Sequence, residues 1–250
     1  MIVDGLSFLG TSRFGYRREP AELLDALDTE GIDLALVAPM HPRDGDLGVA
    51  NKEVAAVVRD HPDRLVAIAR VDPWDGDDAI AQLTSAVHEG GAKGVFLHPD
   101  EETFQINDTR WRPIAERAAE LGVAVLVSTG HHCRSEAGQV ASFAEWCPSV
   151  PVIMTNGGQL NISGLGQVDA ELALALPNVH IFTSGVYRDD FLERAVRTFG
   201  ADRVLFASFA PQFDVGYERR RVYQVHIPEE DRALVLAGNA QRVFGLGGDR

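Results

Sequence analysis

Short apolar runs alternate with longer amphipathic stretches along the whole chain. The apolar runs lie at 2–4, 33–39, 65–71, 94–98, 123–127, 152–154, 179–182 and 204–207. They carry few polar positions, which is typical of strands buried on both faces of a parallel sheet. Eight β-strands are therefore predicted.

The stretches between these runs have helical periodicity. In the first of these stretches, Leu23, Leu24 and Leu27 fall on one face of a helix. The helices are predicted at 20–30, 49–60, 77–88, 108–121, 136–146, 189–199, 217–225 and 228–244, with another from the glycine-rich stretch 156–166 to Leu176. A helix after every strand, with no linker, predicts a single (β/α)8 TIM barrel spanning 1–250. A doubly wound open sheet is the alternative.

The composition narrows the class of protein. The chain has 250 residues, 45% of them hydrophobic, and a formal net charge of −14. This charge opposes binding to nucleic acid or to an anionic membrane, because both need a basic face. The sequence lacks the roughly 20 consecutive apolar residues of a membrane span. Only Cys133 and Cys147 are present, and the first residues show no secretion signal, so we expect a cytoplasmic protein without disulfides.

The end of the last predicted strand poses the functional question. In a TIM barrel the carboxyl ends of the strands carry the chemistry. Here the strand at 204–207 is followed by Ser208, Phe209 and Pro211. A phenylalanine at such a position cannot ligate a metal, transfer a proton or attack a carbonyl.

Several stretches together resemble a known family. They are G-V-F-L-H-P at 94–99, N-D-T-R-W-R-P-I-A-E at 107–116, V-L-V-S-T-G at 125–130, V-I-M-T-N-G-G at 152–158, L-P-N-V-H-I at 176–181, G-A-D-R-V-L-F-A-S at 200–208 and G-N-A-Q-R-V-F-G-L at 238–246. The chain is similar over nearly its whole length to the amidohydrolase-related family. That family comprises metal-dependent hydrolases and decarboxylases, including aminocarboxymuconate-semialdehyde decarboxylase.

The resemblance implies a metal site whose ligands this chain lacks. The family's first strand normally ends in Asp-x-His-x-His, but Leu6 and Phe8 stand at the two histidine places. The histidines of the fifth and sixth strands are replaced by Ser128 and Thr155, and the aspartate of the eighth by Phe209. Leucine and phenylalanine offer no lone pair to a metal. We therefore expect no metal and no cofactor, and we expect these apolar side chains to fill the vacated space. Phe96, where the family often has lysine, should join them.

Other polar residues near the predicted strand ends are weaker candidates for catalysis or binding. The catalytic candidates are Ser128, His131, His98 and Asp4, and the pocket candidates besides Phe96 are His41, Arg70, Asp72 and Ser184. A serine beside a histidine can act as a nucleophile. The alternative is that the histidines are hydrogen-bonded rim residues and that the small residues fill the space of lost ligands.

Two functions follow from these patterns. The first is a non-catalytic homologue that binds a small apolar ligand, or that pairs with its own copy or with an active related subunit. The alternative is a metal-independent hydrolase of esters, thioesters, lactones or amides, or a decarboxylase. Loss of every expected ligand together favours the first.

Overall fold

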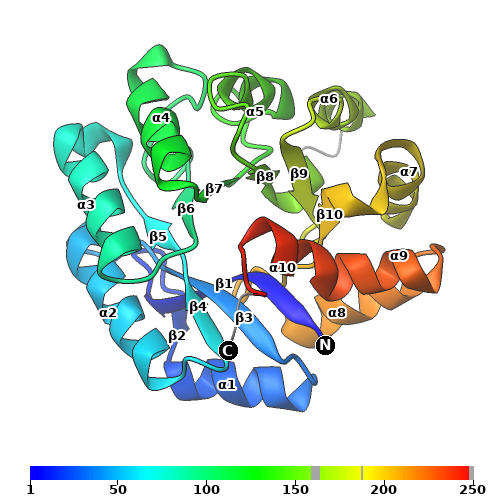
Figure 1. The fold of residues 1–250 in the computed structure, drawn as a ribbon, viewed down its shortest axis with the longest axis horizontal. Coiled ribbons are helices and arrows are strands. Elements are labelled where there is room, and N and C mark those ends of the chain that lie inside the picture. Colours follow the sequence, from blue (N-terminus) through cyan, green and yellow to red (C-terminus); the bar gives the residue numbers. More distant parts are fainter. Residues whose placement is uncertain (159–163, 187, 248–250) are drawn as a thin grey trace.

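Parallel strands form a ring enclosed by helices in the computed structural model, which describes residues 1–158, 164–186 and 188–247 (Figure 1). The strands are β1 (Val3–Thr11), β2 (Arg17–Arg18), β3 (Leu34–Pro39), β4 (Leu65–Ala67), β5 (Ala69–Arg70), β6 (Gly94–Leu97), β7 (Ala124–Val127), β8 (Val152–Met154), β9 (Val179–Phe182) and β10 (Val204–Leu205). The predicted (β/α)8 TIM barrel is confirmed.

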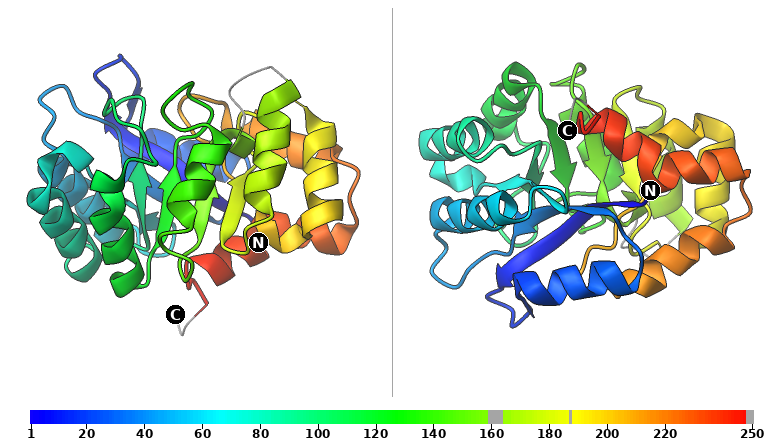
Figure 2. Two further views of the ribbon diagram at one scale, coloured as in Figure 1. Left: turned by 90° about the horizontal axis from the view of Figure 1, so that it is seen from above. Right: turned by 60° about the horizontal axis from the view of Figure 1, so that its bottom comes forward.

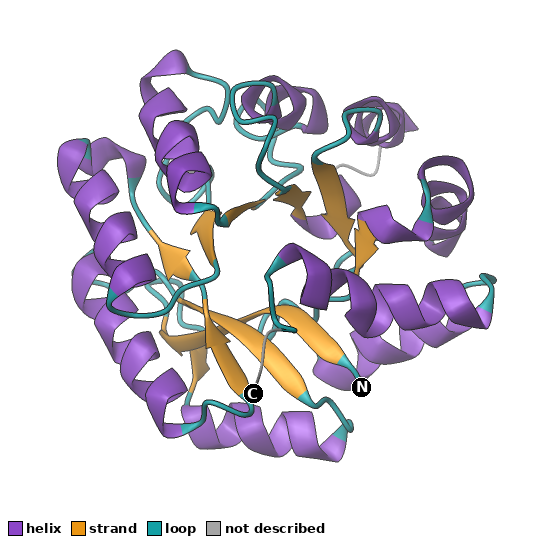
Figure 3. Cartoon of the chain, in the orientation of Figure 1, coloured by secondary structure: helices purple, strands orange, loops and turns teal. Residues whose placement is uncertain are grey.

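The helices surround the ring of strands (Figure 3). They are α1 (Pro20–Thr29), α2 (Leu47–Asp60), α3 (Asp77–His88), α4 (Arg112–Leu121), α5 (Ala137–Ala144), α6 (Gly164–Leu174), α7 (Asp189–Phe199), α8 (Val215–Gln224), α9 (Glu229–Ala233) and α10 (Asn239–Val243). Their apolar faces pack on the outer side of the strands, where a large buried cluster forms. None of the described helices is long and apolar enough to cross a membrane.

The barrel is assembled from two sheets, ordered β2-β1-β3-β4 and β10-β9-β8-β7-β6-β5. On one side they meet at Ile68, between β4 and β5, whose amide donates to the carbonyl of Val37 at 2.9 Å. On the other side the amide of Gly5 donates to the carbonyl of Phe206 at 2.9 Å. A Cβ atom at Gly5 would lie 2.5 Å from the ring of Phe182, so this seam requires glycine.

The two ends of the barrel are covered differently (Figure 2). The β1–β2 hairpin projects past the carboxyl ends of the strands, whereas α9 and α10 lie across the amino ends. The amide of Phe206 donates to the carbonyl of Val235 at 2.8 Å, within the helical segment that closes this lower end. The carboxyl end is therefore the mouth at which a site can form.

Some element boundaries differ from the sequence prediction. The first strand extends to Thr11 rather than stopping at position 4, and the predicted loop after it contains β2. Gly5, Ser7 and Gly10 disfavour strands in isolation, so only the pairing with β3 and β2 reveals the extension. The helix predicted at 228–244 is interrupted by a π-helical turn at Leu234–Gly238. Part of the glycine-rich stretch 156–166 lies outside the described residues.

Candidate functional site

Three phenylalanine rings converge at the mouth of the barrel. The ring centroids of Phe8 and Phe96 are 5.1 Å apart, those of Phe8 and Phe209 are 4.8 Å apart, and those of Phe96 and Phe209 are 6.2 Å apart. Every pair meets edge to face, an arrangement that the charge distribution of aromatic rings favours. Leu6 belongs to the same buried cluster. The predicted convergence of these four side chains is confirmed.

The backbone of Phe209 adopts an unusual conformation to reach this cluster. Its φ is 58°, in the left-handed region, where a bulky residue is a rare outlier. Its amide donates to the carbonyl of Leu6 at 2.9 Å, and its carbonyl accepts from the amide of Gln212 at 3.1 Å. These bonds hold the turn in place while the ring packs on Phe8.

The space left beside the rings is small. A cavity of about 20 Å³ is lined by side chains from the barrel mouth and the hairpin, namely Phe8, Ser12, Tyr16, Met40, His41, Arg70, His98, Glu101, Phe209, Pro211 and Gln212. A single water needs at least about 10–15 Å³ of such space. The cavity therefore has room for about one water molecule and excludes a substrate-sized ligand.

The side chains at the positions where the resemblance implies metal ligands do not fit a metal. Leu6, Phe8 and Phe209 have no donor atom, and Thr155 Oγ1 is engaged, accepting from the amide of Thr129 at 3.1 Å. Within the described part of the chain, no three His, Cys, Asp or Glu side chains form a group that could hold a metal ion. Divalent metals in proteins need several such ligands in a fixed geometry. The donor set therefore does not support the metal site of the resembled family.

Ser128 joins two histidines at the rim of this cluster. Its Oγ lies 3.2 Å from Nε2 of His98 and 3.2 Å from Nε2 of His131. Nδ1 of His98 accepts from the amide of Glu101 at 3.2 Å, so the proton of neutral His98 is on Nε2 and is donated to Ser128. Ser128 then donates to His131, which leaves the Nδ1 proton of His131 facing Asp100 Oδ2 at 3.5 Å.

The hydrogen-bonded series of Asp100, His131 and Ser128 is arranged like a catalytic triad, but its serine is buried away from solvent. Burial lowers the pKa of His98 well below its usual value and also lowers the pKa of His131, so both rings are neutral near pH 7. Ser128 is only 1% exposed and does not line the cavity. A substrate carbonyl therefore cannot reach its Oγ in this conformation.

An ion cluster that the sequence analysis missed lies under His98. The guanidinium of Arg70 donates to Glu101 Oε2 at 2.5 Å and to Glu102 Oε1 at 2.6 Å. Asn51 fixes the backbone of Arg70 through two hydrogen bonds of 2.7 and 2.9 Å. Burial raises the pKa of Glu102 to about 7, and no described residue forms a hydrogen bond with its Oε2. Contacts between residues that are distant in sequence bring this cluster together, and the hydrophobic periodicity of the sequence does not predict such contacts.

Asp4 has a place in the barrel wall rather than in the cavity. Its carboxylate accepts from Ser7 Oγ at 2.5 Å, from Ser208 Oγ at 2.5 Å and from the Ser208 amide at 2.7 Å. Burial raises the pKa of Asp4, opposed by these hydrogen bonds. The network ties β1 to the segment after β10, which gives Asp4 a structural role.

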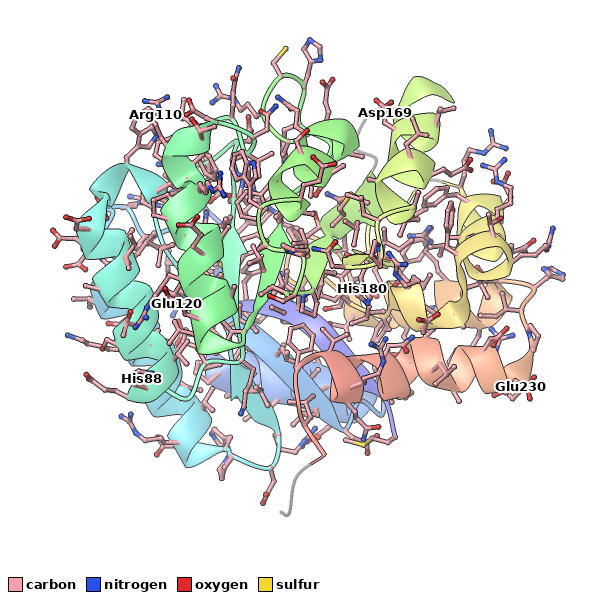
Figure 4. All side chains as sticks on the ribbon, turned by 45° about the horizontal axis from the view of Figure 1, so that its top comes forward. His88, Arg110, Glu120, Asp169, His180 and Glu230 are labelled. Atoms are coloured by element: carbon pink, nitrogen blue, oxygen red, sulfur yellow. The ribbon has the colours of Figure 1, made fainter. Side chains whose placement is uncertain are left out.

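The remaining candidates are dispersed. His41 lines the cavity and bonds the carbonyl of Pro42 through Nδ1 at 2.9 Å, and burial lowers its pKa. Asp72 caps the short turn at Pro73–Asp75. Ser184 Oγ is buried and has no hydrogen-bond partner among the described residues. Neither residue lines the cavity. Of the other histidines, His180 is buried in the interior, whereas His88 lies at the periphery (Figure 4).

Comparison with known proteins agrees with the fold and with the family that the sequence resembles. The sequence model of the Amidohydrolase family matches residues 9–246. This chain belongs to the Amidohydrolase family. Its sequence is 37% identical over 71 residues to a gamma-resorcylate decarboxylase of Rhizobium sp. (strain MTP-10005). That match covers 28% of this chain and 22% of the relative, so the similarity spans about a fifth of the curated relative's length.

Solved structures of decarboxylases share the barrel over nearly the whole chain. The 2,6-dihydroxybenzoate decarboxylase from Rhizobium has a TM-score of 0.78 at 20% identity, covering 99% of both chains. The dihydroxybenzoic acid decarboxylase from Polaromonas sp. JS666, solved with bound manganese, has a TM-score of 0.80 at 16% identity, covering 99% of this chain and 98% of that one. At such identities the likeness establishes the fold alone.

Proposed function

We propose that this chain is a non-catalytic member of the family that has lost its metal-dependent chemistry and works through association with another subunit. The observation that carries the proposal is the packing of Phe8, Phe96 and Phe209 on one another at the barrel mouth. Aromatic rings occupy the places where the resembled family has metal ligands and a lysine. The barrel fold and its surrounding motifs persist, while the side chains that would bind a metal are replaced.

The size of the remaining cavity supports the loss of activity. Ligand pockets usually measure about 300–1,000 Å³, whereas this cavity measures about 20 Å³. An aromatic acid, such as the named substrates of the relatives, has no room there. Without a metal, water must be activated by a general base beside the substrate. His98 and His131 are instead engaged with Ser128.

Exposed aromatic and arginine side chains near the mouth support the association. Phe14 is 60% exposed and Trp74 is 52% exposed. The guanidinium of Arg13 lies 5.0 Å from the Phe14 ring, and that of Arg110 lies 4.9 Å from the Trp74 ring. Aromatic residues and arginine are enriched in protein–protein interfaces. The partner is a second copy of this chain or an active relative.

Three measurements test the proposal. Purified protein supplied with Mn²⁺ should not decarboxylate 2,6-dihydroxybenzoate, and elemental analysis should find no tightly bound metal. Light scattering after size-exclusion chromatography, with capture from the native host, should show an assembly. Turnover that is removed by a chelator would refute the metal-free proposal, and a strictly monomeric protein without a partner would refute the association.

A metal-independent hydrolase is the second candidate, favoured by the alignment of Asp100, His131 and Ser128. It requires a rearrangement that exposes Ser128 Oγ, which is 1% exposed here, while the hydrogen bond from Ser128 to His131 is kept, because His131 would act as the general base. An ester or thioester should then be hydrolysed by the native chain, and Ser128→Ala should abolish that activity. The non-catalytic proposal expects no hydrolysis by either protein.

A further inference from the structure

A groove on the outside of the barrel has the features of a ligand site. It measures about 570 Å³ and lies between the end of β1, the start of α1 and the face of α2. Leu9, Met40 and Val54 form its apolar floor. This volume is within the range of small-molecule sites, unlike the cavity at the barrel mouth.

Two guanidinium groups in this groove, those of Arg18 and Arg43, lack the partners that most arginines of the chain have. Neither guanidinium makes a hydrogen bond or an ion pair with any residue in the described ranges, and both residues line the groove. Arg18 is partly buried, and its Nε is shielded from solvent without an acceptor. The positive charge of Arg18 and its remaining guanidinium donors are therefore free to pair with an incoming anion, and hydrogen bonds between ionised groups are stronger than neutral ones.

Acidic residues at the rim restrict the charge of that anion. Glu19, Asp44 and Glu53 also line the groove, and all three are exposed. Arg17 Nε donates to Glu19 at 2.9 Å, which partly neutralises that carboxylate. The other two carboxylates would repel a second negative charge on a ligand. The groove therefore favours a single negative charge on a molecule with an apolar body.

We propose that this groove binds an amphipathic monocarboxylate, with the carboxylate on Arg18 and the apolar part on Leu9, Met40 and Val54. Arg43, exposed at the edge, adds a weaker, salt-screened attraction. The groove shares Met40 with the cavity at the barrel mouth, but the proposal is independent of the proposed loss of catalysis. A small-molecule anion, rather than a protein, is the occupant because only one of the two unpaired guanidinium groups, that of Arg18, is partly buried, and it lies beside a short apolar floor.

Isothermal titration calorimetry on the full chain tests the site, with sodium octanoate as the probe. Octanoate should bind with a dissociation constant below a millimolar, and Arg18→Gln should weaken binding about tenfold or more, since a charge-assisted hydrogen bond is lost. Arg18→Lys should retain part of the affinity. Arg197→Gln, on the distant α7, is the matched control and should leave the affinity unchanged.

Competing occupants give different results. Octanol, which has the apolar chain without the charge, should bind at least about tenfold more weakly than octanoate. Octyl phosphate should bind more weakly than octanoate at pH 8, because it carries a second charge. No heat with octanoate up to 10 mM, equal binding of octanol, or an unchanged affinity in a folded Arg18→Gln variant would overturn the proposal.

Discussion

The rings of Phe8 and Phe209 meet edge to face with their centroids 4.8 Å apart, although one belongs to β1 and the other follows β10. This contact joins the two ends of the barrel sequence across the seam that closes the ring of strands. The hydrogen bond from the Phe209 amide to the Leu6 carbonyl lies on the same seam. The mouth cluster therefore contributes to closure of the barrel as well as to blocking its pocket.

Phe209→Asp should destabilise the fold by about 3–5 kcal/mol, because it buries an unpaired carboxylate among Phe8 and Phe96. Phe209→Leu, which keeps an apolar side chain, should cost about 1–2 kcal/mol. Urea unfolding of both variants measures the difference. Equal stability of Phe209→Asp and the native chain would mean that the ring is not buried as described.

Gly5→Ala should destabilise the protein by about 1–3 kcal/mol, the usual range for overpacking. The added methyl would lie 2.5 Å from the Phe182 ring and 2.8 Å from the Phe206 carbonyl oxygen. Gly138→Ala, in α5, is the matched control because a methyl group added there would meet no atom within 4 Å, and helix propensity predicts a neutral or stabilising effect. Similar changes at both positions in thermal unfolding would argue against a tight seam at Gly5.

Asp4→Ala should cost about 2–4 kcal/mol, because the hydroxyl and amide of Ser208 and the hydroxyl of Ser7 lose their shared acceptor. Asp190→Ala, at an exposed surface ion pair, should cost under about 0.5 kcal/mol. Chemical unfolding at pH 7 compares them. An Asp4→Ala variant as stable as the native chain would show that the hydrogen bonds of Asp4 do not stabilise the closure of the barrel.

Glu102 should make stability depend on pH. Its pKa is raised from the usual 4.5 to about 7 by burial, so the folded state holds this proton more tightly than the unfolded chain does. Its contribution is complete below pH 4.5 and is lost as the pH rises through 7, by roughly 3 kcal/mol at most.

Glu102→Gln should remove that dependence. The stability of the variant relative to the native chain should increase between pH 5 and pH 8, measured by urea unfolding at both values. A difference that is the same at pH 5 and pH 8 would show that Glu102 titrates normally.

The barrel fold and the aromatic cluster at its mouth could both be predicted from the sequence, for physical reasons. Fully buried parallel strands such as β6 and β7 appear as uninterrupted apolar runs, and their positions were predicted closely. Leu6, Phe8 and Phe209 were expected at the barrel mouth, where the fold itself brings side chains together. In the structure Leu6 and Phe8 lie within the longer β1, and Phe209 follows β10. Their contact therefore followed once the barrel was recognised.

Long-range polar pairing could not be predicted in the same way. Arg70 was expected near the mouth, but its carboxylate partners Glu101 and Glu102 lie in a loop without periodicity. Asp100 was likewise missed as the partner of His131. Such contacts depend on loop conformation, which neighbouring residues in sequence do not specify.

The left-handed backbone at position 209 bears on how reversible the proposed loss of metal chemistry is. Aspartate and asparagine adopt that conformation several times more often than bulky residues, so the main chain there suits the aspartate of the resembled family better than the present phenylalanine. The obstacle to its return is the pair of rings at Phe8 and Phe96, which would surround the carboxylate with apolar atoms. An evolutionary path back to a metal site would therefore need these neighbours to change first, and each of those steps would open a hole in the core before any function returned.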